Sequence, residues 1–328
     1  MTFSANGQYL LSGDRRGVQV WRVEDGTHVA RMGVWHVHCL AVCKNGRWIA
    51  AGTYWGNVHV WDAKTHKQVF WHKDSRIITG VDFSPDSTRL VSASNNKKAT
   101  ICDIPAGKRV QILYHDDWVR AAKYSPQGDR IATATFESIR IWDSNDGRLL
   151  LNIKVGVTPL FNTGLLWSNS HLFVISGSHV QQIDASTGSA VSEWTVPKSG
   201  GYLCIALAKH GEFIAYSAKR TVTFCDTSSH IQLGHIQHPH DIYCTALSPD
   251  DEFIAIGRKG GKVCLSRITV SVLFRLIVEH TSDSDLFAHR IRSLCLIYTQ
   301  HSRNQSFKSM APRSIHGSSI SSRTQKHH

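Results

Sequence analysis

The stretch IRIWD at residues 139–143 is one copy of a motif that recurs along the chain at nearly constant spacing. Other copies read VHVWD at residues 58–62 and VTFCD at residues 222–226. The residues at the tryptophan position of the successive copies are Trp21, Trp61, Cys102, Trp142, Ile183, Cys225 and Ser266. Neighbouring members of this series lie 40 to 42 residues apart. A fixed period of this length is typical of repeat architectures, so the sequence predicts seven copies of one structural unit.

Each copy follows a turn signal and a second apolar run. The turn reads FSPD at residues 83–86, YSPQG at residues 124–128 and LSPDD at residues 247–251. Proline fixes φ at the second turn position, and Asp, Asn or Gly suits the positions after it. Because the apolar residues show no helical periodicity, each unit is expected to form four short strands separated by turns. A single sheet of this size cannot bury both of its faces, so neighbouring units must stack.

The repeat resembles that of the WD40-repeat β-propeller family. The resemblance rests on the period, on the Trp-Asp pairs at residues 61–62 and 142–143, and on the Phe-Ser-Pro-Asp turn, and it covers about residues 1–280. Within this family the repeats are most similar to those of WD40-like proteins of mushroom-forming fungi, as in WDSNDGR at residues 142–148. The resemblance implies an all-β fold, a seven-bladed β-propeller of four-stranded antiparallel blades, which we expect to span residues 1–297.

Small residues occupy one shared position in the first strand of six units. They are Cys39, Gly80, Ala121, Gly164, Cys204 and Cys244. The first strand of each propeller blade lines the central axis, where the wedge-shaped blades converge and side chains have the least room. We therefore expect these six residues to lie nearest the axis.

The two ends of the chain are expected to differ from the repeats. The first unit lacks most of its inner strand, because the chain begins at Met1. Residues 291–296 (IRSLCL) resemble the inner strand at residues 119–124, so we expect them to complete blade one. Residues 298–328 are rich in Ser, Lys and Arg without apolar periodicity, which predicts a basic, disordered tail. The abrupt change in composition also fits a segment of a longer protein.

Charge and cysteine content restrict the class of protein. The chain has 37 Lys plus Arg against 25 Asp plus Glu, giving a formal net charge of +12. Residues 286–328 carry seven of the basic residues and no acidic one, so the charge does not by itself indicate that the repeats bind nucleic acid. No apolar run approaches about 18 residues, so we expect no membrane span, and no signal peptide is visible. The eight Cys contain no Cys-x-x-Cys pair, which favours reduced thiols in the cytoplasm or the nucleus.

Basic residues recur in the turn between the second and third strands of four units. Because equivalent turns of a propeller surround one mouth of its central channel, we expect them to form one basic rim with aromatic residues beside it. The predicted partner-binding residues are Arg15, Arg16, Trp55, Lys97, Lys98, Trp118, Phe136, Lys219, Arg220, Arg258 and Lys259, with Trp35 nearby. Basic groups with aromatic anchors suit an acidic or phosphorylated peptide. The alternative is that these exposed turns are charged for solubility alone.

Residues of catalytic or metal-binding type do not form a recognisable set. No Ser-His-Asp arrangement or nucleophile elbow is visible. The pair His36 and His38 is compatible with metal ligation if both lie in one strand, but no Cys or carboxylate supports it at a fixed spacing. We therefore predict no catalytic residue, no metal site and no cofactor. The family resemblance implies instead that His115 and His240 hold their blades together by hydrogen bonds.

These observations favour a non-enzymatic protein-interaction scaffold. A rigid disc would present loops to a protein or acidic peptide, as a monomeric propeller within a complex, in the cytoplasm or alternatively the nucleus. One alternative is the binding of nucleic acid or phosphoinositide through the basic rim and tail. A second is a sensor module belonging to a larger multidomain protein. A propeller enzyme is the least favoured alternative, because fold alone does not exclude it.

Overall fold

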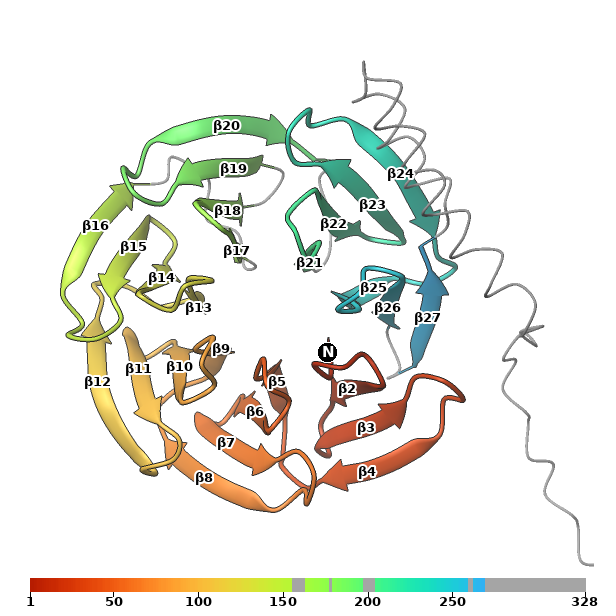
Figure 1. Cartoon of the computed structure of the whole chain (residues 1–328), viewed down its shortest axis with the longest axis horizontal. Coiled ribbons are helices and arrows are strands. Elements are labelled where there is room, and N and C mark those ends of the chain that lie inside the picture. Colours follow the sequence, from red (N-terminus) through yellow and green to blue (C-terminus); the bar gives the residue numbers. More distant parts are fainter. Residues whose placement is uncertain (155–162, 177–178, 197–203, 259–261, 269–328) are drawn as a thin grey trace, which may run out of the picture. The chain divides into compact units, whose positions relative to one another are not determined.

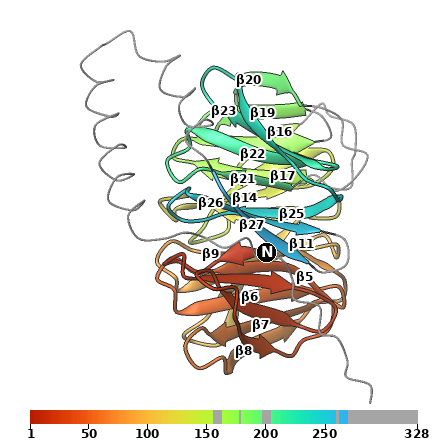
Figure 2. The same ribbon diagram turned by 90° about the vertical axis from the view of Figure 1, so that its right-hand side faces the viewer.

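Strands alone make up the regular structure of the part of the chain that the computed structural model describes, which is residues 1–154, 163–176, 179–196, 204–258 and 262–268. No helix in these ranges is long and apolar enough to cross a membrane. The strands form seven antiparallel sheets around a central axis, which is a seven-bladed β-propeller (Figure 1). Figure 2 shows the ring from the side, with the strands running across its thickness and the turns at its two faces.

Consecutive strands are hydrogen-bonded neighbours, and the first strand of each blade is innermost (Figure 1). Blade one consists of β1 (Thr2–Phe3), β2 (Tyr9–Gly13), β3 (Val18–Arg22) and β4 (His28–Met32). Blade two consists of β5 (Val37–Val42), β6 (Trp48–Thr53), β7 (Asn57–Asp62) and β8 (Gln68–Lys73). Blade three consists of β9 (Ile78–Phe83), β10 (Arg89–Ser94), β11 (Lys98–Asp103) and β12 (Lys108–Tyr114).

The remaining blades continue the same order around the ring. Blade four consists of β13 (Ala121–Tyr124), β14 (Arg130–Ala134), β15 (Ser138–Asp143) and β16 (Leu149–Lys154). Blade five consists of β17 (Thr163–Ser168), β18 (His171–Ser176), β19 (His179–Asp184) and β20 (Ala190–Thr195). Blade six consists of β21 (Cys204–Leu207), β22 (Phe213–Ala218), β23 (Thr221–Asp226) and β24 (Gln232–Gln237). Blade seven has three strands in the described ranges, which are β25 (Ile242–Leu247), β26 (Phe253–Arg258) and β27 (Val263–Arg267).

The repeated Trp-Asp motif coincides with an irregularity in strand pairing. The motif lies at the end of the third strand, and in blades one to six the register with the fourth strand shifts immediately before the tryptophan position. In blade four, Ile141 pairs with Leu151, whereas Trp142 pairs with Leu149. A bulge of this kind bends a strand and increases its twist. The period of the sequence therefore marks a bend that recurs in the outer half of blades one to six.

The six small residues expected near the axis all lie in innermost strands, as predicted. Each pairs with the second strand of its own blade and lies beside the next inner strand of the ring. A Cβ added at Gly80 would lie 3.5 Å from the Cα of Ala121, and the Cys204 thiol donates a hydrogen bond of 2.8 Å to the carbonyl oxygen of Tyr243. Small side chains at this register let the inner strands of neighbouring blades approach closely.

Apolar side chains between blades form the core and close the ring. Val60 of blade two and Ile78 of blade three are both fully buried and belong to one cluster. Phe3 of blade one belongs to a cluster with Ala255 of blade seven. The first and seventh blades are therefore joined by side-chain packing, in the same way as the other neighbours. Within the described residues, this packing is what joins the two ends of the repeat region.

The N-terminus differs from expectation. We expected blade one to lack its inner strand, but β1 supplies a short one, in which Thr2 pairs with Leu11 and Phe3 with Leu10. Two residues suffice because a strand of this length still pairs with β2 and buries Phe3. Residues 291–296, proposed to complete this blade, and residues 298–328, proposed to form a tail, lie outside the described ranges. Both of those proposals stay predictions.

Candidate functional site

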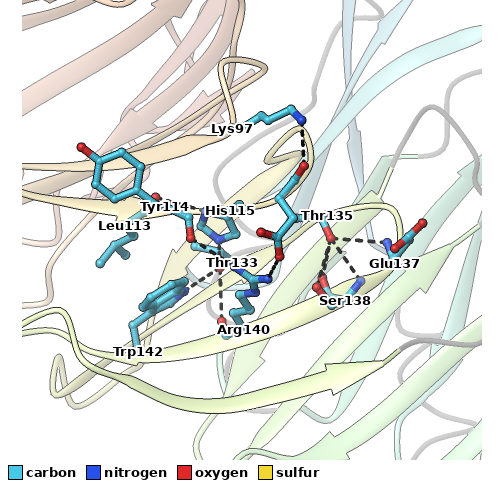
Figure 3. Close-up of polar contacts among 11 residues, drawn as sticks. Lys97, Leu113, Tyr114, His115, Thr133, Thr135, Glu137, Ser138, Arg140 and Trp142 are labelled. Atoms are coloured by element: carbon cyan, nitrogen blue, oxygen red, sulfur yellow. Dashed lines mark hydrogen bonds and ion pairs between the residues drawn. The ribbon is translucent and has the colours of Figure 1, made fainter.

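A buried hydrogen-bond chain fixes the loop that enters blade four (Figure 3). Trp142 Nε1 donates to Thr133 Oγ1 at 2.8 Å, and Thr133 Oγ1 lies 2.8 Å from His115 Nε2. His115 Nδ1 lies 3.1 Å from the carbonyl oxygen of Leu113, which can only accept, so Nδ1 carries the proton. Burial, reinforced by the nearby Arg140 guanidinium, lowers the pKa of His115 to about 4. The neutral imidazole therefore accepts at Nε2 from the Thr133 hydroxyl.

The stability of blade four is expected to depend on the protonation of His115. Its pKa is about 4 in the folded chain against an ordinary value of 6.5, so between these values the unfolded chain binds more protons. The stabilisation is therefore complete above pH 6.5 and is lost as the pH falls towards 4. The difference in free energy of unfolding between wild type and His115→Asn, measured by urea denaturation, should shrink over this range. A difference that does not change with pH would contradict this assignment.

The corresponding histidine of blade seven is not the one expected. His240 is exposed, whereas His238 is buried and its Nδ1 lies 3.2 Å from the backbone nitrogen of His240. His238 precedes the small residue Cys244 by the same interval as His115 precedes Ala121. Counting back from that small residue would have identified it. His36 and His38 also do not lie on the same face of one strand, because β5 begins at Val37 and His36 belongs to the preceding turn.

The turns predicted to form a rim lie on one face of the ring, together with the loops that connect successive blades. The backbone nitrogen of His36 donates to the carbonyl oxygen of Arg15 at 3.1 Å, and that of His115 donates to Lys97 at 3.0 Å. His238 donates in the same way to Arg220 at 2.7 Å. We call this side of the propeller the upper face. It comprises the turns between second and third strands and the loops between blades.

The predicted basic residues of the upper face differ in their exposure and in whether they have a local polar partner. Lys97 Nζ donates to the carbonyl oxygen of Asp116 at 2.8 Å, and Arg220 lies 3.3 Å from the Asp241 carboxylate. Lys98 and Arg258, at strand ends, are half-buried, whereas Arg15, Arg16 and Lys219 are exposed. Lys259 lies outside the described residues. The rim is therefore basic, but part of its charge already has local partners, which weakens its field.

Aromatic side chains form a second group on this face, over blades one and two. Trp35 and Trp55 are 72% and 58% exposed. The Trp55 ring meets Tyr54 at 5.4 Å and His36 at 5.8 Å between ring centroids, both edge-on. Tyr54 and Trp35 lie in different inter-strand segments, so the fold gathers aromatic residues that the sequence separates. Exposed aromatic groups of this size are typical of protein-binding surfaces.

Arg120, which sequence reasoning did not select, joins Trp118 and Phe136 into a third group. The guanidinium carbon lies 4.9 Å from the Trp118 ring centroid and 4.0 Å from that of Phe136. These are cation–π distances. The sequence signal was its position, because Arg120 directly precedes Ala121, the axial small residue of blade four. Trp118 and Phe136, which were predicted from separate segments, thus both contact the guanidinium of Arg120.

Comparison with known proteins identifies the repeats. The family described as WD domain, G-beta repeat, matches residues 30–62 and 64–103. Residues 30–103 thus match two WD40 repeats. It is similar to the U3 small nucleolar RNA-associated protein 15 homolog of Xenopus laevis, with 25% identity over 242 residues, covering 68% of this chain and 44% of that protein. The serine-threonine kinase receptor-associated protein of Gallus gallus is 21% identical over 280 residues, covering 82% of this chain and 78% of that protein.

Other relatives match shorter segments. WD repeat-containing protein 1 of Rattus norvegicus is 29% identical over 144 residues, covering 42% of this chain and 24% of that protein. The chain thus spans less than half the length of both the U3-associated relative and WD repeat-containing protein 1. These similarities show that the repeat is shared with these proteins. They do not identify a binding partner of this chain.

Solved propellers share the fold at low identity. The β-propeller domain of Cps50 (Swd1) from Myceliophteria thermophila superposes with a TM-score of 0.73 and 16% identity, covering 81% of this chain and 96% of that one. A chain of the mitotic checkpoint complex gives 0.72 and 16%, covering 81% and 86%. A chain of Kuenenia stuttgartiensis hydrazine synthase gives 0.73 and 15%, covering 82% and 95%. Because that last protein is named as an enzyme, the fold alone does not decide whether this chain is one.

Proposed function

We propose that this WD40 chain is a non-enzymatic protein-interaction scaffold that binds a protein or acidic peptide across its upper face. The observation that carries the proposal is the pattern of turns around that face. The turns between second and third strands are basic in blades one, three and six and aromatic in blades two and four. Aromatic anchors supply most of the affinity at protein interfaces, and rim charges speed association with an acidic partner. One face of the molecule offers both.

Location, assembly and subgroup are further parts of the proposal. We propose a monomeric propeller that works within a complex, in the cytoplasm or the nucleus. The likeness to a chain of the mitotic checkpoint complex supports a role within a complex. The similarity to a U3 small nucleolar RNA-associated protein supports a nuclear location. The WDSNDGR stretch at residues 142–148 supports a place among fungal WD40-like proteins.

Reversing the rim charge is expected to disrupt partner binding. The rim variant replaces Lys97, Lys98, Lys219 and Arg220 with Glu. The control variant makes the same replacement at four exposed lysines in turns of the opposite face, which are Lys44, Lys64, Lys67 and Lys209. Association should slow about tenfold or more in the first variant only, because electrostatic steering reverses. Affinity capture with mass spectrometry and binding kinetics would measure this. If a folded rim variant captured the same set of proteins as wild type, the interface would lie elsewhere on the molecule.

Nucleic acid or phosphoinositide is the alternative occupant of the same basic turns. Such binding depends steeply on salt, because each phosphate contact releases counterions. A peptide held through aromatic anchors should lose less affinity between low and physiological salt. Capture of the same partner at both salt concentrations supports the scaffold. Binding to RNA or lipid vesicles alone, abolished by moderate salt, would favour the alternative.

A further inference from the structure

Arg120 is a cation of the upper face for which the described residues supply no ion-pair partner. Its backbone nitrogen donates to the carbonyl oxygen of Ala134 at 2.7 Å, which ties this end of the loop to β14. The next residue, Ala121, begins the innermost strand β13. The guanidinium therefore lies where the upper face meets the axis. Trp118 and Phe136 contact it from two segments of the same face.

Neighbouring basic side chains of blade four show that an anion is usually provided. Lys123 lies 2.8 Å from the Asp82 carboxylate. Arg140 pairs with Asp116 and also donates to the carbonyl oxygen of Tyr114 at 3.1 Å. Arg130 Nε lies 3.7 Å from the Asp129 carboxylate. In the described residues the Arg120 guanidinium makes neither a hydrogen bond nor an ion pair, and its Nε and Nη2 are buried without a partner.

This arrangement is unfavourable in the free protein and is relieved by an anion. Burial disfavours the charged guanidinium and lowers the pKa of Arg120, whereas the negative charge of Asp117 raises it by a smaller amount. A cation removed from water without hydrogen bonds or a counter-ion costs free energy. Cation–π contacts offset part of this cost. A carboxylate can accept two parallel N–H hydrogen bonds from a guanidinium. No group of the described chain accepts such a pair of hydrogen bonds from Arg120.

We propose that Arg120 is an anion-binding residue of the upper face, and that it takes an aspartate or glutamate carboxylate of a partner peptide. The proposal rests on the proposed function and gives it a specific contact. Trp118, 39% exposed, lies over the guanidinium, so rotation of its ring would admit the carboxylate while the indole packs on the peptide. The basic turn of blade three, with Lys97, lies on the same face and favours an acidic segment.

The test uses the full chain with fluorescein-labelled hexaglutamate as probe, and fluorescence anisotropy as readout. Arg120→Met is expected to weaken binding about tenfold or more, as loss of a charge-assisted contact does. The matched control Arg109→Met removes the same charge from the exposed outer strand β12 and should change affinity less than about twofold. Arg120→Met should also unfold at the same or a higher urea concentration than wild type, because it removes an unpaired cation.

Each outcome decides between the proposals. Equal binding by wild type and Arg120→Met overturns this inference and leaves the scaffold function standing. If wild type binds an oligouridine but not hexaglutamate, the occupant is nucleic acid and both proposals fail. If Arg120→Met does not fold, Arg120 is structural and the inference is overturned, unless Arg120→Lys folds. That variant keeps the charge and loses the two parallel donors, so it should then bind several-fold more weakly than wild type.

Discussion

Replacing Gly164 with phenylalanine is expected to lower the free energy of unfolding by about 3 kcal/mol or more. Gly164 lies in β17, the innermost strand of blade five, and a Cβ built there would lie 2.3 Å from Ile205 Cδ1 and 2.7 Å from Cγ1. Ile205 belongs to β21, the inner strand of blade six. A large ring at this register would therefore push two neighbouring blades apart at the narrow end of their wedges.

The chain offers a matched control for this overpacking. At Gly80, the same register in blade three, an added Cβ meets its nearest atoms at 3.5 Å, which is ordinary contact. Gly80→Ala should thus change stability little, whereas Gly164→Ala should destabilise and Gly164→Phe more so. Urea denaturation followed by circular dichroism would rank the three. Equal stability of the two alanine variants would show that the taper does not constrain this position.

Truncating Trp55 to alanine is expected to weaken partner binding by about 2 kcal/mol, or about 30-fold in dissociation constant. Trp55 is 58% exposed on the upper face and is positioned by edge contacts with Tyr54 and His36. A large, already ordered side chain loses little freedom when it becomes buried against a partner. Its loss should therefore appear mainly as faster dissociation, whereas the rim charges act on association.

Trp71 provides the control for Trp55. It is equally exposed, at 56%, but it lies on the outer strand β8, away from the upper face. Trp71→Ala should leave the dissociation rate of the captured partner unchanged in surface plasmon resonance. A larger effect from Trp71 than from Trp55 would place the interface on the outer strands.

The repeat and its inner register could be predicted because they are imposed locally. Trp61 and Trp142 each follow the register shift between the third and fourth strands that recurs with the repeat, and the small residues follow from the limited room near the axis. The inner strand of blade one was missed because two residues carry no visible pattern. His238 was missed because His240, followed by an acidic residue, resembled the His115 segment in sequence.

The candidate site was predictable as a set of turns but not as a set of contacts. Antiparallel strands bring equivalent turns to one face, so the positions of Arg15, Lys97 and Lys219 followed from the repeat. Which charges have local partners did not follow, because Lys97 meets the carbonyl oxygen of Asp116 only through the course of the loop that leaves β12. Arg120 carries no motif beyond its position before Ala121, and its contacts with Trp118 and Phe136 arise only in the fold.

Hydrogen–deuterium exchange of the free chain and of its complex with the captured partner tests the central claim most directly. If the partner binds across the upper face, protection should increase in residues 14–17, 54–56, 95–97 and 115–120, which are turns and inter-blade loops of that face. The turns of the opposite face, such as residues 63–67 and 144–148, should exchange as in the free chain. Protection confined to those turns, or to the outer strands β4, β8 and β12, would contradict the account.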